Sequence, residues 1–252
     1  MVHGVKKVVY FRFYAELNDF LPYKKRQLSF AYHYWGTPSV KNAIQVHGVP
    51  HTEVDLVLVN GRAVDFSYHL RPKDRISVYP VFESLDISAI NPLRGKPLRR
   101  LRFVVDANLG KLARYIRMLG MDALYNNQFE DAEIIRISRA ENRIILTRDL
   151  GILKQNFVSK GYFLRSPDPK TQLAEVVRRF DLYADISPFS RCMECNGTLK
   201  SIEKEKIKDS LDNETRSIFH EFYLCSNCAK IYWKGSHYER MLEMIEKLAK
   251  KS

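Results

Sequence analysis

The sequence predicts an α/β protein, with a parallel-sheet domain between a small α+β domain and a cysteine-rich metal module. Strand-like apolar runs alternate with amphipathic helical segments over residues 101–186, which is typical of a parallel sheet with helices on its faces. Residues 1–86 instead contain several β-rich runs around one helix. Two Cys-x-x-Cys pairs lie between residues 192 and 228. A chain of 252 residues is long enough for two domains and such a module.

The first 86 residues are predicted to form a domain with the element order ββαβββ. We expect its helix to begin at Thr37-Pro38, with the threonine as the cap and the proline as the first helical residue. Asn60-Gly61 predicts a tight hairpin turn, because both residues tolerate positive φ. The strand-like runs cover residues 5–14, 28–35, 54–59 and 76–82.

This order resembles the ubiquitin-like β-grasp fold, and the runs 57–61 and 76–81 are most similar to the branch of small sulfur carriers. Those carriers end in a free Gly-Gly. Here the chain continues through residues 83–86 without one, which disfavours sulfur transfer and protein modification. We therefore expect the domain at 1–86 to position the rest of the chain or to bind a protein or ribonucleoprotein partner.

Residues 87–100 predict a basic linker, because breaker residues such as Asn91-Pro92 interrupt any regular element there. Arg99 and Arg100 end its run of positive charges. Such a run is either a solvated linker or a strip that contacts phosphates.

Residues 101–190 predict the parallel-sheet domain. Gly120 is expected to end its first helix. The predicted strands cover residues 101–105, 143–147 and 161–165, and the predicted helices cover residues 109–119, 131–140, 150–159 and 173–180.

Acidic residues follow two of these strands directly. Asp106 comes after the first strand and Asp149 after the second, while Asp131 and Glu133 begin the helix between them. The carboxyl ends of parallel strands are where open α/β sheets build their sites. Carboxylates that converge there would repel one another unless Mg²⁺ or Mn²⁺ joined them. Each acid taken alone is equally explained as a helix cap or a turn residue.

The net charge of +12 is concentrated in the middle of the chain, since residues 91–190 carry +7 of it. A basic surface attracts polyanions such as RNA. Lys111, Arg114 and Arg117 recur at every third position of the first helix, away from its apolar stripe, and Arg148 precedes Asp149. They are either phosphate contacts or an ordinary solvated face.

The four cysteines, Cys192, Cys195, Cys225 and Cys228, predict a zinc ribbon over residues 191–236, followed by a C-terminal helix at 237–252. Four thiolates close the coordination shell of Zn²⁺, so this metal is expected to be structural. Disulfides are the alternative. No signal peptide precedes the chain and no apolar run reaches membrane-span length, so we expect a cytoplasmic protein in which metal is favoured over disulfides.

Three strings of sequence are more specific than any spacing. They are residues 103–120 (FVVDANLGKLARYIRMLG), 145–149 (ILTRD) and 231–238 (IYWKGSHY). Together they resemble the Mut-seven C-terminal RNase family, a PIN-like ribonuclease domain with a C-terminal zinc ribbon, often fused to a ubiquitin-like domain. The resemblance implies metal-dependent RNA cleavage. Asp106, Asp131 and Asp149 are then the catalytic acids, with Glu133 and Asp168 as possible additions.

The main hypothesis is therefore a PIN-type ribonuclease that uses Mg²⁺ or Mn²⁺ to hydrolyse RNA phosphodiester bonds. The alternative is a non-catalytic RNA-binding adaptor that uses the same basic surface and zinc ribbon. Tyr232, Trp233 and His237, just after the second cysteine pair, either stack on bases or pack the ribbon against its neighbour.

Overall fold

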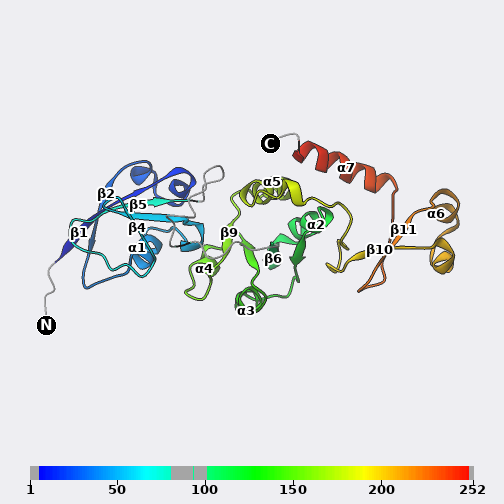
Figure 1. The fold of residues 1–252 in the computed structure, drawn as a ribbon, viewed down its shortest axis with the longest axis horizontal. Helices are drawn as coiled ribbons and strands as arrows, with labels where there is room; N and C mark the ends of the chain where they lie inside the picture. The colour runs from blue at the N-terminus through cyan, green and yellow to red at the C-terminus, as the bar shows by residue number, and fades with distance from the viewer. Residues whose placement is uncertain (1–5, 81–92, 94–100, 250–252) are drawn as a thin grey trace. The chain divides into compact units, whose positions relative to one another are not determined.

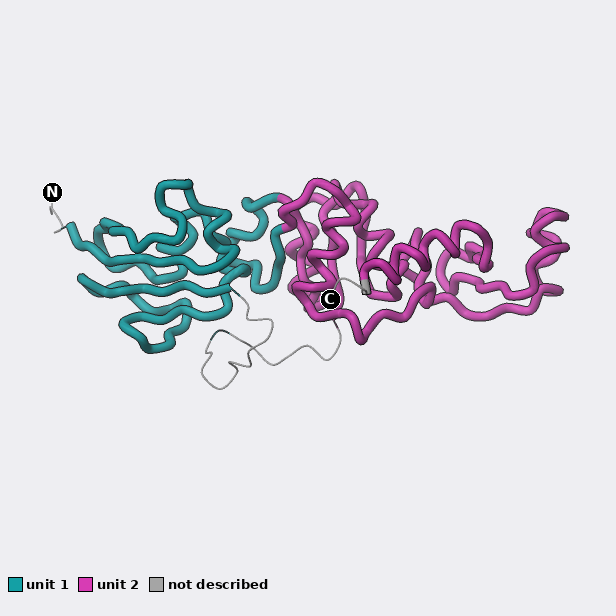
Figure 2. The backbone as a smooth tube through the Cα atoms, turned by 90° about the horizontal axis from the view of Figure 1, so that it is seen from above, with its two compact units in different colours: residues 1–100, 149–163 teal, residues 101–148, 164–252 magenta. Residues whose placement is uncertain are grey.

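The computed structural model describes residues 6–80, 93 and 101–249. Its contacts divide the chain into two compact units, which are described separately: residues 1–100 with 149–163, and residues 101–148 with 164–252 (Figure 2). Apart from Leu93, the predicted basic linker, including Arg99 and Arg100, lies outside the described residues.

The first unit contains a five-stranded mixed sheet with the strand order β2-β1-β5-β3-β4 (Figure 1). The central strands β1 and β5 run parallel, and the other pairs are antiparallel. The predicted ββαβββ order and β-grasp topology are confirmed. The elements are β1 (Lys7–Phe13), β2 (Phe30–Tyr34), α1 (Val40–Val46), β3 (Leu56–Val59), β4 (Arg62–Val64) and β5 (Arg75–Tyr79).

The hairpin between β3 and β4 forms at the predicted turn. Asn60 and Gly61 both have positive φ, 52° and 83°, as a two-residue hairpin loop requires. The predicted start of α1 is wrong by two residues, because Ser39 caps the helix through a bond from the Asn42 N–H at 3.2 Å. The carbonyl of Pro38 instead accepts from the Leu70 N–H at 3.0 Å, which holds this residue in extended backbone.

One hydrophobic core fills the space between α1 and the sheet. Ile44 on the helix and Phe11 and Phe13 on β1 are fully or almost fully buried. His47, at the end of α1, packs edge-on against Phe11 at a centroid distance of 5.1 Å, and burial lowers its pKa to about 4. The histidine is therefore a neutral member of the aromatic core.

A four-stranded sheet with the order β7-β6-β8-β9 forms the centre of the parallel-sheet region. Strand β6 pairs in parallel with β8, as predicted, and also in parallel with β7. Strand β7 was not predicted, because three residues are too few to show a period. The elements are β6 (Arg102–Val105), α2 (Gly110–Met118), β7 (Asp122–Leu124), α3 (Asp131–Glu141), β8 (Ile144–Thr147), α4 (Leu150–Leu153), β9 (Gly161–Phe163) and α5 (Pro169–Arg179).

Gly120 ends α2 as predicted, for two reasons. Its φ of +89° is strained for any other residue, and a Cβ there would lie 2.1 Å from the carbonyl oxygen of Ser187. Helix α4 is much shorter than the predicted 150–159. The carbonyl of Lys154 accepts from the Gln45 side chain at 2.7 Å, in place of an N–H one turn further along.

The ribbon is a three-stranded antiparallel sheet, β10-β11-β12. The segment between the cysteine pairs contains β10, the short helix α6 and most of β11. Helix α7 then returns beside α5, where residues of both helices line a shallow hollow (Figure 1). No helix in the described ranges is long and apolar enough to cross a membrane. The elements are β10 (Leu199–Ile202), α6 (Asn213–Ile218), β11 (Phe222–Cys225), β12 (Ile231–Trp233) and α7 (Ser236–Ala249).

Candidate metal centre and candidate active site

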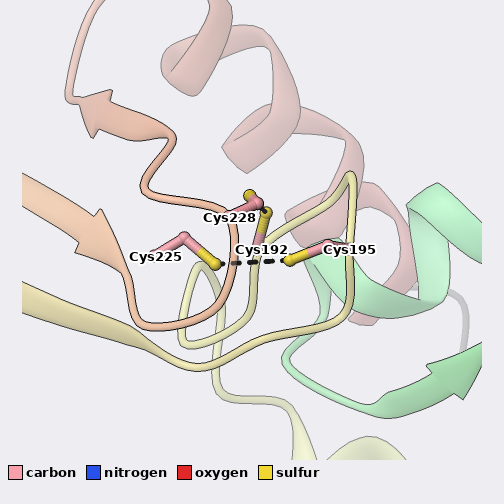
Figure 3. Close-up of side chains that lie close together, drawn as sticks. All are labelled: Cys192, Cys195, Cys225 and Cys228. Carbon is pink, nitrogen blue, oxygen red and sulfur yellow. Dashed lines mark hydrogen bonds between the residues drawn. The ribbon is translucent and has the colours of Figure 1, made fainter.

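The four cysteine side chains converge on one point in the ribbon (Figure 3). Their Sγ atoms all lie within 4.8 Å of one another. Cys192 and Cys228 are 3.7 Å apart at sulfur, and Cys195 and Cys225 are 3.4 Å apart. Four sulfurs about 2.3 Å from a tetrahedral ion would be separated by just under 4 Å. The donor set and its spacing therefore fit one zinc ion without rearrangement.

Both cysteine pairs are shaped by the same backbone turn. In the first, the Asn196 N–H donates to the Cys192 carbonyl at 3.0 Å, and the Cys192 N–H donates to the Gly197 carbonyl at 2.7 Å. The fifth residue of each turn has positive φ, 67° at Asn196 and 55° at Ala229. In the second turn, the equivalent bonds join Cys225 to Ala229 at 3.2 Å and to Lys230 at 3.0 Å.

The thiols of the cluster share hydrogen bonds, which favour the thiolate form at Cys195 and the protonated form at Cys228. Burial raises the pKa of Cys195, but the Gly197 N–H and the neighbouring sulfurs outweigh this effect and lower it to about 6. The Tyr232 hydroxyl lies 3.1 Å from the Cys192 sulfur. Burial and this contact raise the pKa of Tyr232, so its phenol stays protonated and can donate to a thiolate.

Arg117 joins α2 to the first cysteine turn. Its guanidinium donates to the carbonyls of Ala123 at 2.8 Å, Met193 at 3.1 Å and Glu194 at 2.7 Å. Only 2% of Arg117 is exposed. The prediction that it contacts RNA from a solvated face is therefore wrong, because backbone carbonyls of the protein already surround it.

Asp122, on the unpredicted strand β7, is the second link between ribbon and sheet. Its carboxylate accepts from Asn196 at 2.8 Å and from Arg143 at 2.6 Å. Burial raises the pKa of Asp122, but these bonds outweigh it and hold the pKa below its usual range. Asn196 also accepts from the Ala123 N–H at 3.1 Å. The metal module is thus fixed to the edge of the sheet by buried polar contacts.

Asp106 is the best-placed candidate catalytic acid. It follows β6, its N–H continues the ladder to the Leu146 carbonyl at 3.0 Å, and only 8% of the residue is exposed. Thr147, at the end of the neighbouring strand β8, donates its hydroxyl to the carboxylate at 2.5 Å. The Asn108 N–H also donates to it, at 3.3 Å. The carboxylate is therefore held at the carboxyl edge of the sheet in a fixed orientation.

Asp131 and Glu133 both lie in the first turn of α3, as predicted. Asp131 is exposed. Glu133 accepts two bonds from Arg136, at 2.8 and 2.7 Å, and this guanidinium lowers its pKa. Glu133 is thus engaged in an ion pair on the surface of its own helix.

Asp149 and Asp168 both cap helices. The Gly151 N–H donates to Asp149 at 2.6 Å at the start of α4. Asp168 accepts from the N–H and the hydroxyl of Thr171, at 2.8 and 2.9 Å, and these bonds lower its pKa. Capping leaves a carboxylate with lone pairs for a second partner. Of the described residues, only the four cysteines form a group of three or more ligands within reach of one ion.

The segment that begins at Asp149 is packed into the first unit. The His51 ring, 5% exposed, bonds through Nε2 to the Val158 carbonyl at 2.7 Å. Glu53, 2% exposed, accepts from the Phe163 N–H at 2.6 Å. Burial and the nearby Lys41 lower the pKa of His51 to about 4, so the ring is neutral and donates from Nε2. The β-grasp domain therefore holds residues 149–163 through buried side chains.

The remaining basic candidates are exposed. Lys111 lies in the first turn of α2, and Arg148 precedes Asp149. Arg114 forms an ion pair with Glu194 of the ribbon, so part of its charge is neutralised.

Two protein-family models match this chain. The model of the Mut7-C RNAse domain matches residues 101–245, more than half of the chain. The chain belongs to the Mut7-C RNase domain family. A second model, described as Mut7-C ubiquitin, matches residues 6–86. Searches of curated proteins and of solved structures returned no match for this chain.

Membership of the Mut7-C family means that the chain carries a ribonuclease-type domain. The matched range runs from β6 through the ribbon into α7, so sheet and metal module together make up the Mut7-C unit. The sequence reasoning missed Asp122 and Asn196, which join these two parts. An asparagine directly after the first Cys-x-x-Cys was the one available signal.

Proposed function

We propose that this protein is a metal-dependent ribonuclease of PIN type that hydrolyses RNA phosphodiester bonds. The observation that carries the proposal is the buried, oriented carboxylate of Asp106 at the carboxyl edge of β6, in a domain of the Mut7-C RNase family. We assign Asp131 and Asp149 as the further catalytic acids that act with Asp106. Glu133 and Asp168 have local roles in an ion pair and a helix cap.

The chemistry of these residues suits Mg²⁺ or Mn²⁺, which prefer carboxylate oxygens. Bound there, such an ion would polarise the scissile phosphate and make the attacking water more acidic. Thr147 keeps the Asp106 carboxylate in one orientation, which lowers the reorganisation needed to bind an ion. We assign Lys111 and Arg148, which are both exposed, to contact the phosphates of the RNA backbone.

The zinc ion is assigned a structural role, because four cysteines leave it no open position. The β-grasp domain is assigned to hold the segment that starts with Asp149. It also exposes large apolar side chains, among them Trp35 and Tyr23, which suit a protein or ribonucleoprotein partner. Thiols kept free for a metal suit the cytoplasm.

Cleavage of end-labelled single-stranded RNA tests the proposal. The parent protein is compared with the Asp106→Asn/Asp149→Asn double variant, each with Mg²⁺ or Mn²⁺. We expect cleavage by the parent alone. Absence of cleavage by both, with RNA still bound, would favour the adaptor.

A further inference from the structure

A groove of about 800 Å³ lies between α2, the ribbon sheet and the start of α7. This aromatic groove, as we call it, is within the range of about 300–1,000 Å³ that is typical of ligand pockets. Of the described residues, neither the four cysteines nor the candidate catalytic acids line it. The groove is therefore distinct from both sites described above.

The lining of the aromatic groove combines rings with positive charge. Seven of its side chains are aromatic, and its single acidic residue is Glu194. Glu194 is shared by Arg114 and by Lys230, whose Nζ lies 3.1 Å away. Lys111 and Lys234 add two further exposed cations, of which Lys234 is paired with Glu221 at 2.5 Å. Four cations thus stand against two carboxylates, Glu194 and Glu221, and the groove keeps a net positive charge.

The rings are held in place by the metal module. Trp233 packs against Phe219 and Phe222 at centroid distances of 6.3 and 6.5 Å, yet 37% of it remains exposed. Tyr232, next to it in β12, is anchored by its contact with the Cys192 sulfur. The two rings thus pack within the ribbon and still line the groove. Rings fixed in this way lose little conformational entropy when a ligand stacks on them.

We propose that the aromatic groove binds unpaired bases of single-stranded RNA next to the cleavage site. Stacking uses the flat face that every base has, and the cations suit the phosphates between successive bases. The groove is lined on α2 by Lys111, in the first turn of this helix, and a single 3-10 turn (Ala107–Leu109) separates α2 from Asp106. RNA seated in it would extend toward the proposed catalytic edge. The inference rests on the proposed function in taking RNA as the ligand.

An acidic protein segment is the competing occupant. It would satisfy the four cations but would leave the aromatic surface without partners of matching shape. The number of rings therefore favours nucleic acid, and the experiment includes a test of the competitor.

The test is fluorescence-anisotropy binding of the full chain to a labelled 12-nucleotide single-stranded RNA and to a duplex of equal length. Added Mg²⁺ and Mn²⁺ are omitted, so binding is measured independently of cleavage. We expect Trp233→Ala to weaken single-strand binding by about 5- to 100-fold, and to affect duplex binding much less. Trp233→Phe should recover most of the loss, because it keeps a stacking ring.

Charge is tested with Lys111→Glu, which should weaken binding and reduce the slope of log affinity against log salt by about 0.7 or more. The matched control is Lys200→Glu. Lys200 is exposed on β10 and lies outside the groove, next to the lining residue Leu199. Zinc content and circular dichroism confirm that each variant is folded.

Unchanged single-strand affinity in folded Trp233→Ala and Lys111→Glu would overturn the proposal, while RNA cleavage by the parent would leave the proposed function intact. Equal loss with Trp233→Ala for single strand and duplex would also overturn it. So would competition by polyglutamate as effective as competition by unlabelled RNA, since charge alone would then explain the groove.

Discussion

In the ribbon, both Cys-x-x-Cys pairs are closed by the same two backbone hydrogen bonds, whereas at the acidic sheet edge each carboxylate has a different kind of partner. Asp106 is held by Thr147 across two strands, Asp149 caps a short helix, and Asp131 begins a longer one. The cysteines thus obtain their geometry from segments of a few residues. Asp106 instead depends on the packing of two strands whose contacting residues are 41 positions apart in the sequence.

The metal centre is organised within one small module, Asp106 is held by the sheet, and residues 149–163 are held by the β-grasp domain. Each region can therefore be perturbed while the others are monitored.

Removing a cysteine should have the largest effect. We expect Cys192→Ser to reduce zinc from about one ion per chain to near zero, because a three-sulfur site lacks its closing ligand. Zinc is measured by atomic absorption on protein purified without chelator. The Asp106→Asn variant is the control and should retain its zinc. Parent protein that contains no zinc would contradict the assignment of the metal centre.

Replacing Asp106 should slow cleavage strongly without affecting the zinc ribbon. We expect Asp106→Asn to lower the single-turnover cleavage rate by at least about 100-fold, since a metal ligand contributes several kcal/mol to the transition state. Glu133→Gln is the matched control, and its rate should stay close to that of the parent because Arg136 already holds Glu133. A large loss of rate in Glu133→Gln with little loss in Asp106→Asn would assign the catalytic role to Glu133 instead.

The link between the two regions is tested at Asp122. We expect Asp122→Ala to lower the free energy of unfolding by about 2–3 kcal/mol, because Arg143 is left buried without its main partner. Since the pKa of Asp122 is lowered by folding, its contribution is present above pH ~4 and is lost as the pH falls further. Urea unfolding of Glu141→Ala, which removes the exposed partner of the same arginine, should show a loss below about 1 kcal/mol.

The bonds by which the β-grasp domain holds residues 149–163, from His51 to Val158 and from Phe163 to Glu53, are tested by changing the pH. His51 has a pKa of about 4 in the folded chain and about 6.5 when unfolded. Its contribution to stability is therefore complete above pH ~6.5 and is lost as the pH falls from 6.5 toward 4, by up to about 3 kcal/mol. His47 titrates in the same window. We expect His51→Gln and His47→Gln each to reduce the pH dependence of the free energy of unfolding. Only His51→Gln is expected to speed hydrogen exchange at residues 149–163.

Equal exchange rates at 149–163 in both histidine variants would contradict this role of His51, because His47 packs against Phe11 and Tyr32 in the aromatic core of the β-grasp domain. The measurement separates a local loss of contacts from general destabilisation.

The sequence predicted the features that local patterns determine. The β-grasp order, the Asn60-Gly61 turn, the end of α2 at Gly120 and the four-cysteine cluster are confirmed. Each follows from a period, a turn preference or a short spacing.

Features that tertiary contacts determine could not be predicted. Strand β7 is too short to show a pattern, and α4 is shortened because side chains of the β-grasp domain take the carbonyls that a longer helix would use. Arg117 resembles its exposed neighbours on α2 in spacing, yet it is buried under the first cysteine turn. Nothing in the local sequence distinguishes it from Arg114.

The central claim is that catalytic metal and structural zinc occupy separate sites, and Mn²⁺ binding tests it without reference to cleavage. Zinc-loaded parent protein and the Asp106→Asn/Asp149→Asn variant are titrated with Mn²⁺, and free Mn²⁺ is followed by electron paramagnetic resonance. We predict one or two bound Mn²⁺ ions per parent chain, a large loss of this binding in the variant, and the same zinc content in both. Equal Mn²⁺ binding by parent and variant would contradict the account.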